Sequence, residues 1–205
     1  MYLTRLTLDP RSAQARRDLG SAYEMHRTLV RAFVEDDRSR PSRFLWRLEL
    51  GRNTWDCPTV LVQAETKGNW SVIEELPNYL QLPAESKSIL LDRLVQPDRR
   101  YRFRLLANPT VSRKGKRHAL AGEGDQIGWI ERQGKRHGFQ VLCSVVAGKD
   151  RCKSPGKDKP AIYIERVCFE GILKSTETVD LQRALVAGIG PAKAFGCGLL
   201  SLAPC

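Results

Sequence analysis

Four residues near the N-terminus, Tyr23, His26, Arg27 and Arg31, are of the types that can cut a phosphodiester bond. Tyr23 and His26 are three positions apart, so on a helix their side chains are neighbours. Histidine is the usual side chain for moving a proton near neutral pH, a tyrosine hydroxyl can orient or assist it, and two arginines can neutralise a phosphodiester. Such a set suffices for RNA cleavage without a metal, because the 2′-OH of the RNA itself can attack the adjacent phosphorus.

The alternative is that His26 is an ordinary histidine at the border of a surface helix. On a helical wheel it lies at the edge of an apolar stripe, half shielded, with Tyr23 and Arg27 outward of it. The stripe is formed by Ala22, Met25, Leu29, Ala32 and Phe33. The other two histidines, His118 and His137, each end a basic cluster and are interpreted as members of charged loops.

A basic cluster in the second half of the chain indicates RNA binding. Arg113, Lys114, Lys116 and Arg117 follow a predicted strand whose polar face carries Arg102 and Arg104. Clustered cations on a hairpin can follow the phosphate walls of an RNA duplex, whose deep major groove attracts cations but resists reading by side chains. A second lysine-rich stretch, 148–160, is diluted by aspartates, and a solvated loop is an equal alternative for it.

The net charge supports a polyanionic partner. The chain has 34 Lys and Arg against 23 Asp and Glu, a net charge of +11. Residues 1–90 contribute +1 and residues 91–205 contribute +10, so the excess lies in the C-terminal part. We therefore expect nucleic acid as the partner, with a merely soluble basic surface as the alternative.

Composition limits the class of protein. The 205 residues, of which 41% are hydrophobic, can form one large domain or two small ones. There is no apolar run of about 18 residues and no apolar signal-peptide core, so we expect no membrane association and a cytoplasmic location. The six cysteines show no C-x-x-C spacing and lie far from the histidines. They predict reduced thiols and no metal site, and no cofactor is expected.

Hydrophobic periodicity predicts an α+β fold of two tandem ferredoxin-like (RRM-like) βαββαβ domains. The first half predicts a strand, a polar loop, a helix capped by Ser21 and Glu24, two strands, a short helix and a weakly patterned last strand. These lie at residues 2–8, 9–20, 21–35, 44–50, 59–63, 70–79 and 87–95. The second half repeats the order. Strands are predicted at residues 100–105, 139–146, 161–173 and 199–202, a basic loop at 113–118, and helices at 125–133 and 179–186.

We expect domain 1–88 to carry the catalytic helix, and domain 97–205 to carry the basic loops and a glycine-rich loop at 188–198. One mixed sheet is the alternative architecture. The glycine-rich loop matches neither a Walker A sequence nor a dinucleotide fingerprint. Such loops can present backbone N–H groups to phosphates, or serve as a structural turn.

Several motifs, in order over nearly the whole chain, make the sequence resemble the CasE family, the repeat-processing endoribonucleases of type I-E CRISPR systems. They are Met1–Leu6, Tyr23–Leu29, Leu45–Glu49, Arg102–Pro109, Gly115–Arg117, Phe169–Gly171 and the terminal glycine loop with Gly198–Ser201. The resemblance implies tandem ferredoxin-like domains and metal-independent cutting at the base of a repeat hairpin, which leaves a 2′,3′-cyclic phosphate and a 5′-hydroxyl.

The resemblance also implies partners and roles. The family keeps its product, the mature guide RNA, and joins the other subunits of the Cascade surveillance complex. Its catalytic histidine and companion tyrosine match His26 and Tyr23, and Arg27 matches a position beside that histidine. The main alternative is a non-catalytic stem-loop RNA-binding scaffold of the same fold. A small-nucleotide phosphoesterase would need two H-x-[ST] motifs, a pair that the chain lacks.

Overall fold

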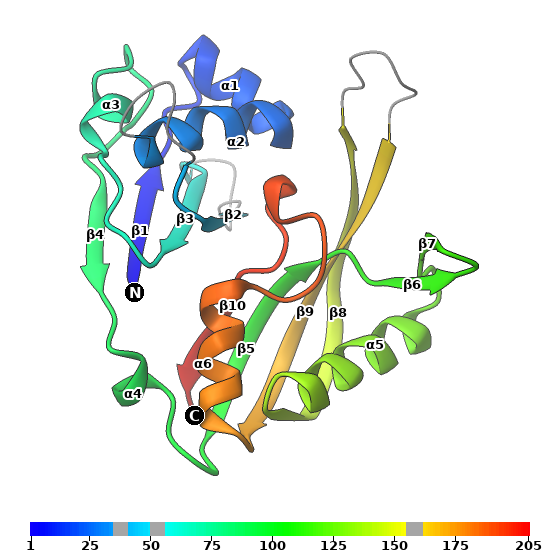
Figure 1. Cartoon of the computed structure of the whole chain (residues 1–205). Helices are drawn as coiled ribbons and strands as arrows, with labels where there is room; N and C mark the ends of the chain where they lie inside the picture. The colour runs from blue at the N-terminus through cyan, green and yellow to red at the C-terminus, as the bar shows by residue number, and fades with distance from the viewer. Residues whose placement is uncertain (35–40, 50–55, 155–161) are drawn as a thin grey trace. The chain divides into compact units, whose positions relative to one another are not determined.

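The computed structural model describes residues 1–34, 41–49, 56–154 and 162–205 (Figure 1). It divides into two compact units, each described separately below. Unit 1 comprises Met1–Ile89 and two short later segments, and unit 2 comprises Leu90–Cys152, Ile162–Lys193 and Cys197–Cys205. None of the helices in the described ranges is long and apolar enough to cross a membrane.

Unit 1 is built on a four-stranded antiparallel sheet with the strand order β2-β3-β1-β4. Strand β1 is central and pairs with both β3 and β4. The elements are β1 (Tyr2–Thr7), α1 (Ala13–Gly20), α2 (Ala22–Val30), the 3-10 turn η1 (Arg31–Phe33), β2 (Phe44–Glu49), β3 (Thr59–Ala64), α3 (Ser71–Glu74) and β4 (Glu85–Ser88). The prediction of the last strand at 87–95 is largely wrong. Strand β4 shares only Lys87 and Ser88 with that range, and residues 91–94 form the short helix α4 (Leu91–Leu94). All four residues of β4 are exposed, so no apolar alternation marks the strand in the sequence.

The apolar stripe predicted for the first helix is the face that α2 and η1 bury. Met25, Leu29, Ala32 and Phe33 are all less than 9% exposed. They form one core cluster with sheet residues on β1, β2 and β3, chiefly Leu6, Phe44, Trp46, Val60 and Val62. Helix α2 begins where predicted, because the Ser21 hydroxyl accepts a hydrogen bond from the Glu24 backbone N–H at 3.4 Å.

The prediction of a polar loop over residues 9–20 is wrong, because this stretch contains α1. Ser12 caps α1 by accepting a hydrogen bond from the Ala15 N–H at 3.4 Å. The helix is only eight residues long, and its mean composition is polar. Its strong helix formers, including Ala13, Gln14 and Ala15, therefore carried no periodic apolar signal.

Unit 2 repeats the topology, with the strand order β10-β5-β9-β8. If the strands are counted within each unit, both sheets have the spatial order second, third, first, last. This shared order confirms two tandem ferredoxin-like sheets. The elements are α4 (Leu91–Leu94), β5 (Arg100–Ala107), β6 (Thr110–Arg113), β7 (Lys116–Ala119), α5 (Glu123–Arg136), β8 (Phe139–Ser154), β9 (Ile162–Ser175), α6 (Thr178–Ala187), the 3-10 turn η2 (Lys193–Phe195) and β10 (Leu200–Pro204). The domain limits 1–88 and 97–205 stay a prediction.

Two predicted loops in unit 2 differ from the structure. The basic loop 113–118 is the turn and second strand of a hairpin, in which β6 and β7 form their own two-stranded sheet. The predicted loop 148–160 begins inside β8, which continues to Ser154, and residues 155–161 lie outside the described part. Both stretches are strongly charged, so their sequences lack the alternation of apolar and polar residues that predicts a strand.

The core of unit 2 lies between its sheet and helices α5 and α6. Along β5, Tyr101, Phe103 and Leu105 are buried while the arginines between them are exposed, as the alternation predicts. Trp129 and Ile130 from α5 pack into the same cluster, and so do Leu181 and Leu185 from α6. One face of β5 is therefore apolar and the opposite face cationic.

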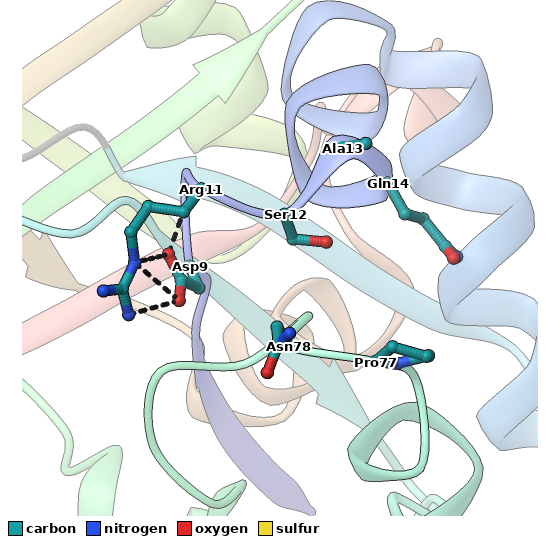
Figure 2. A pocket seen from close by; sticks show the side chains of 7 residues that line it. All are labelled: Asp9, Arg11, Ser12, Ala13, Gln14, Pro77 and Asn78. Carbon is teal, nitrogen blue, oxygen red and sulfur yellow. Dashed lines mark hydrogen bonds and ion pairs between the residues drawn. The ribbon is translucent and has the colours of Figure 1, made fainter.

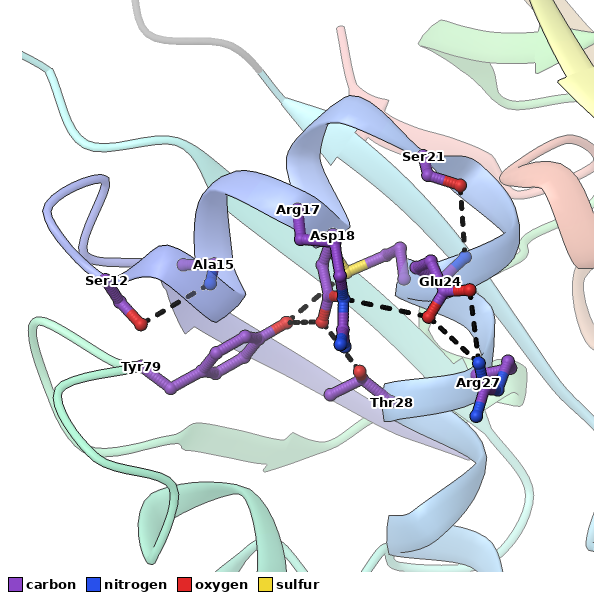
Figure 3. A network of polar contacts seen from close by, with 10 residues as sticks. Ser12, Ala15, Arg17, Asp18, Ser21, Glu24, Arg27, Thr28 and Tyr79 are labelled. Carbon is purple, nitrogen blue, oxygen red and sulfur yellow. Dashed lines mark hydrogen bonds and ion pairs between the residues drawn. The ribbon is translucent and has the colours of Figure 1, made fainter.

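A buried carboxylate, Asp18, ties α1 to α2 in unit 1 (Figure 3). Its side chain is inaccessible to solvent and accepts hydrogen bonds from the Thr28 hydroxyl at 2.6 Å and the Tyr79 hydroxyl at 2.9 Å. Arg17 donates to the other oxygen from Nε at 3.1 Å and from Nη2 at 3.0 Å. Burial, followed by the nearby Asp18 charge, raises the pKa of Tyr79 above its usual value, so this hydroxyl remains a donor.

Replacing Tyr79 by Phe should lower the free energy of unfolding by about 1.5–3 kcal/mol, because a buried carboxylate loses a donor. Urea denaturation followed by circular dichroism measures the change. Tyr2→Phe is the matched control, since the Tyr2 hydroxyl has no hydrogen-bond partner within the described ranges. Equal losses in the two variants would contradict the role assigned to the Asp18 contact.

Candidate functional site

Helix α2 presents Tyr23, His26 and Arg27 as the helical spacing predicts. Tyr23 is 38% exposed, His26 is half-buried and Arg27 is exposed. Arg31 is also exposed but lies in η1, immediately after α2 ends. The first three residues therefore share one rigid helix, and the fourth lies at its C-terminal end.

The imidazole of His26 is seated on a column of buried aromatic rings. It stacks on Phe44 of β2 with ring centroids 5.1 Å apart and planes inclined by 25°. Phe44 in turn stacks on Phe33 at 4.6 Å, and Trp70 meets Phe33 edge-on at 5.6 Å. The sequence predicted the buried strand containing Phe44, but nothing in its pattern indicated that this ring lies under His26. The stack fixes the plane of the imidazole.

Burial determines the charge state of His26. It lowers the pKa of the imidazole below the usual value of 6.5, so the ring is neutral at pH 7. The Nδ1 atom is buried and has no hydrogen-bond partner in the described part of the chain. No carboxylate there orients this ring, which leaves Nε2 as the nitrogen available to a reacting group.

Arg27 forms an ion pair with Glu24, which lies three positions earlier on α2 (Figure 3). Its Nη1 donates to both Glu24 carboxylate oxygens at 3.1 Å, and its guanidinium lies 5.9 Å from the centroid of the Tyr23 ring. Glu24 also lies 3.7 Å from Arg17 Nε, the same group that donates to Asp18. From the sequence pattern, Glu24 is predicted only as a capping residue. Its contact with Arg27 follows the i,i+3 spacing and could have been found from it.

In unit 2, the predicted RNA-binding cations of the basic cluster lie on the β6–β7 hairpin and are all exposed. Lys114 and Gly115 form its two-residue turn, with φ of 48° and 74°. Such a turn needs positive φ at both positions, which favours glycine at the second. Arg113 pairs across the hairpin with Lys116, so two like charges face each other and repel. A polyanion bound there would relieve that repulsion.

The two cations of β5 differ. Arg102 and Arg104 both point from the exposed face of the strand. Arg104 Nε lies 2.6 Å from a Glu170 oxygen on β9, whereas Arg102 has no ion pair among residues 1–34, 41–49, 56–154 and 162–205. An RNA phosphate would therefore compete with Glu170 for Arg104 but would meet no such competition at Arg102.

A hollow in the unit 1 surface beside α1 contains none of these residues. This hollow of about 550 Å³ is lined by Asp9, Arg11, Ser12 and neighbours from α1 and the 77–78 turn, as Figure 2 shows. Arg11 Nη2 lies 2.8 Å from Asp9, and its hydrogen bonds lower the pKa of that carboxyl. None of the predicted site residues lines it. Within the described ranges, no three His, Cys, Asp or Glu side chains gather as metal ligands.

The predicted residues therefore form two groups, one in each unit. Tyr23, His26 and Arg27 come together on α2, with Arg31 at its end. The hairpin cations and Arg102 and Arg104 lie in unit 2. His118 is exposed on β7, and His137 is half-buried at the C-terminal end of α5.

Comparison with known proteins gives matches over the full chain. A family model described as CRISPR associated protein matches residues 1–204. The CRISPR-associated endoribonuclease Cse3 of Thermus thermophilus is 39% identical over 220 residues, and the CRISPR system Cascade subunit CasE of Escherichia coli is 30% identical over 219 residues; each match covers 100% of both chains. A solved structure of Cse3 bound to a 19-nucleotide RNA has a TM-score of 0.89 at 36% identity, with 100% of both chains covered.

These matches agree with the fold, since both units have the strand order that the resemblance implied. The sequence identities of 39% and 30% extend over the complete length of both relatives. The chain belongs to the CasE family of CRISPR-associated proteins.

Proposed function

We propose that the chain is an endoribonuclease that cuts CRISPR repeat RNA at the base of its stem-loop and keeps the mature guide RNA as a Cascade subunit. The observation that carries the proposal is His26, neutral and held on the Phe44 ring beside Tyr23 and Arg27. The naming of Cse3 as an endoribonuclease, its structure with bound RNA and the naming of CasE as a Cascade subunit support it.

The proposed reaction is a transesterification within the RNA. Nε2 of neutral His26 takes the proton from the 2′-OH, whose oxygen attacks the adjacent phosphorus. The bond from phosphorus to the 5′-oxygen then breaks, and that oxygen receives a proton from Tyr23 or from water. The products are a 2′,3′-cyclic phosphate and a 5′-hydroxyl, and no water is consumed and no metal is needed.

Arg27 and Arg31 are proposed to stabilise the negative charge that grows on the phosphoryl oxygens. Glu24 occupies one terminal nitrogen of Arg27, while the guanidinium remains 63% exposed, so other donors can reach a phosphate. Tyr23 is proposed to orient His26 or to share in proton transfer, and the Arg27 guanidinium lies 5.9 Å from the centroid of its ring.

Unit 2 is proposed to supply affinity. The hairpin cations Arg113, Lys114, Lys116 and Arg117, with Arg102 and Arg104, would contact the phosphates of the RNA stem. A non-catalytic RNA-binding scaffold would retain this surface and lack the chemistry of α2, so cleavage assays distinguish the two functions.

The function is tested by single-turnover cleavage of a repeat stem-loop RNA. His26→Ala should lower the rate by about 10²–10⁴-fold, the usual effect of losing a general acid or base, while RNA affinity stays near normal. Tyr23→Phe should lower it less if Tyr23 mainly orients its neighbour. Full activity of a folded His26→Ala variant would remove His26 from the mechanism.

The substrate offers a matched control for the same assay. One 2′-deoxy substitution immediately upstream of the scissile phosphate removes the nucleophile and leaves the other contacts, so the RNA should bind and not be cut. Cleavage of this RNA would show that the 2′-OH is not the nucleophile, whatever the variants do.

Removal of divalent metal should leave the rate unchanged, because the proposed steps use only side chains and the 2′-OH. The measurement compares single-turnover rates after dialysis against a chelator with rates after magnesium is added back. Activity that disappears on chelation and returns with magnesium would refute the metal-independent mechanism. Denatured protein is excluded by confirming RNA binding in the same samples.

The pH dependence of kcat/KM should report His26 as a base. Burial lowers its folded pKa, so the neutral form is lost only as the pH falls through a value below 6.5. We therefore expect kcat/KM to rise with pH through an apparent pKa below 6.5 and to level off once His26 is neutral. A rate that instead falls as the pH rises through this range would assign His26 the role of acid.

A further inference from the structure

A hollow of about 800 Å³ in unit 2 lies between the β6–β7 hairpin, helix α5 and the loop that follows α6. Its cationic lining consists of Arg117 from β7, Arg132 and Arg136 from α5, His137 at the end of α5, and Lys193 from the glycine-rich loop. The volume is within the range of about 300–1,000 Å³ typical of ligand clefts.

Two arginines of the hollow are held by the helix that carries them. Arg132 and Arg136 are four positions apart on α5 and so share one face. Gly128 lies one turn earlier, and a Cβ added there would be 3.2 Å from Arg132 Nη1. The missing side chain thus gives the Arg132 guanidinium room to lie along the helix.

The wall formed by the glycine-rich loop is also fixed. Gly190 has φ of +80° and approaches the indole of Trp129 so closely that an added Cβ would lie 3.1 Å from the ring. Trp129 is 4% exposed and stacks on Phe169 of β9 at 6.0 Å. The loop that carries Lys193 therefore rests on the core of unit 2, and the hollow is bounded by packed elements.

The hollow gathers several cationic side chains, and three of them are arginines. No Asp or Glu lines it, and Arg117, Arg132 and Arg136 have no ion pair within the described ranges. Burial, then the charges of Arg136 and Lys193, lower the pKa of His137, and Asp180 opposes them. Asp180 itself lies 3.2 Å from Arg183. Several like charges therefore stand close together, an arrangement that an anion would stabilise.

We propose that this hollow binds phosphate groups of the RNA backbone, as a second anion site of unit 2 beside the hairpin. Arg117 belongs to the hairpin and to the hollow, so a strand that follows the hairpin cations passes directly to Arg132 and Arg136. Arginine suits this ligand, because its planar guanidinium can donate two parallel hydrogen bonds to a phosphodiester. The choice of RNA over free phosphate rests on the proposed function.

The test measures the salt dependence of binding to the uncleavable 2′-deoxy stem-loop RNA. Arg132→Ala with Arg136→Ala should weaken binding at least tenfold and reduce the slope of log affinity against log salt by about 1.4–1.8, since each lost phosphate contact contributes about 0.7–0.9. Lys135→Ala is the matched control, because Lys135 is exposed on the same helix but does not line the hollow. It should change the slope by clearly less than the double variant.

A second measurement distinguishes the sources of phosphate. The ring resonances of His137 are followed by NMR against pH, alone, with inorganic phosphate and with the uncleavable RNA. An anion in the hollow should raise the pKa of His137, and the RNA should do so at far lower concentration than inorganic phosphate. Response to inorganic phosphate only, or a double variant with the slope of Lys135→Ala, would overturn the proposal.

The outcome is independent of the cleavage test. Binding and salt slope are measured on RNA that is not cut, whereas His26→Ala affects the rate of cutting. Normal cutting by His26→Ala would refute the proposed mechanism and leave the slope result intact. An unchanged slope in the double variant would refute the second anion site and leave the cleavage result intact.

Discussion

The carboxylate of Asp18 is buried in unit 1, and the geometry of α2 depends on how its charge is compensated. An isolated buried carboxylate is costly, so its partners must stay in place. They come from three parts of the chain: Arg17 from α1, Thr28 from α2 and Tyr79 from the segment before β4. Movement of α2 along α1 would break these contacts together. The helix that presents Tyr23 and His26 is thereby fixed from beneath.

The chemistry proposed for α2 follows from a second constraint, the low polarity around His26. The same burial that seats the ring on Phe44 also lowers its pKa and leaves Nδ1 without a partner. A more exposed histidine would hold its plane less firmly and carry more positive charge. A carboxylate beside Nδ1 would favour the protonated ring. The aromatic seat therefore both orients the ring and keeps it neutral, the two properties that the proposed role of His26 as a base requires.

Local patterns predicted most of the elements but missed α1 and the strands of the β6–β7 hairpin. Contacts between distant segments could not be predicted from such patterns at all. The cap at Ser21, the apolar stripe of α2 and the alternation of β5 depend on neighbours within a few residues, and all were found. The Tyr79–Asp18 hydrogen bond joins residues 61 positions apart, and no periodicity indicates it. Arg132 and Arg136 have the spacing of a shared helical face, but a cationic face is usually solvated. Only the loop packed on Trp129 makes it one side of a hollow.

The cations of the two units differ in whether an RNA phosphate would have to compete with a carboxylate for them. In unit 1, Arg27 is already paired with Glu24, at a surface where such a pair contributes only about 0–1 kcal/mol, so sharing it with a phosphate costs little. That pairing limits the affinity gained there. In unit 2, Arg117, Arg132 and Arg136 have no ion pair with a carboxylate in the described part of the chain, so a phosphate there would meet no such competition. In the proposed function, binding free energy would thus come mainly from unit 2, while Arg27 and Arg31 in unit 1 would act on the reacting phosphate.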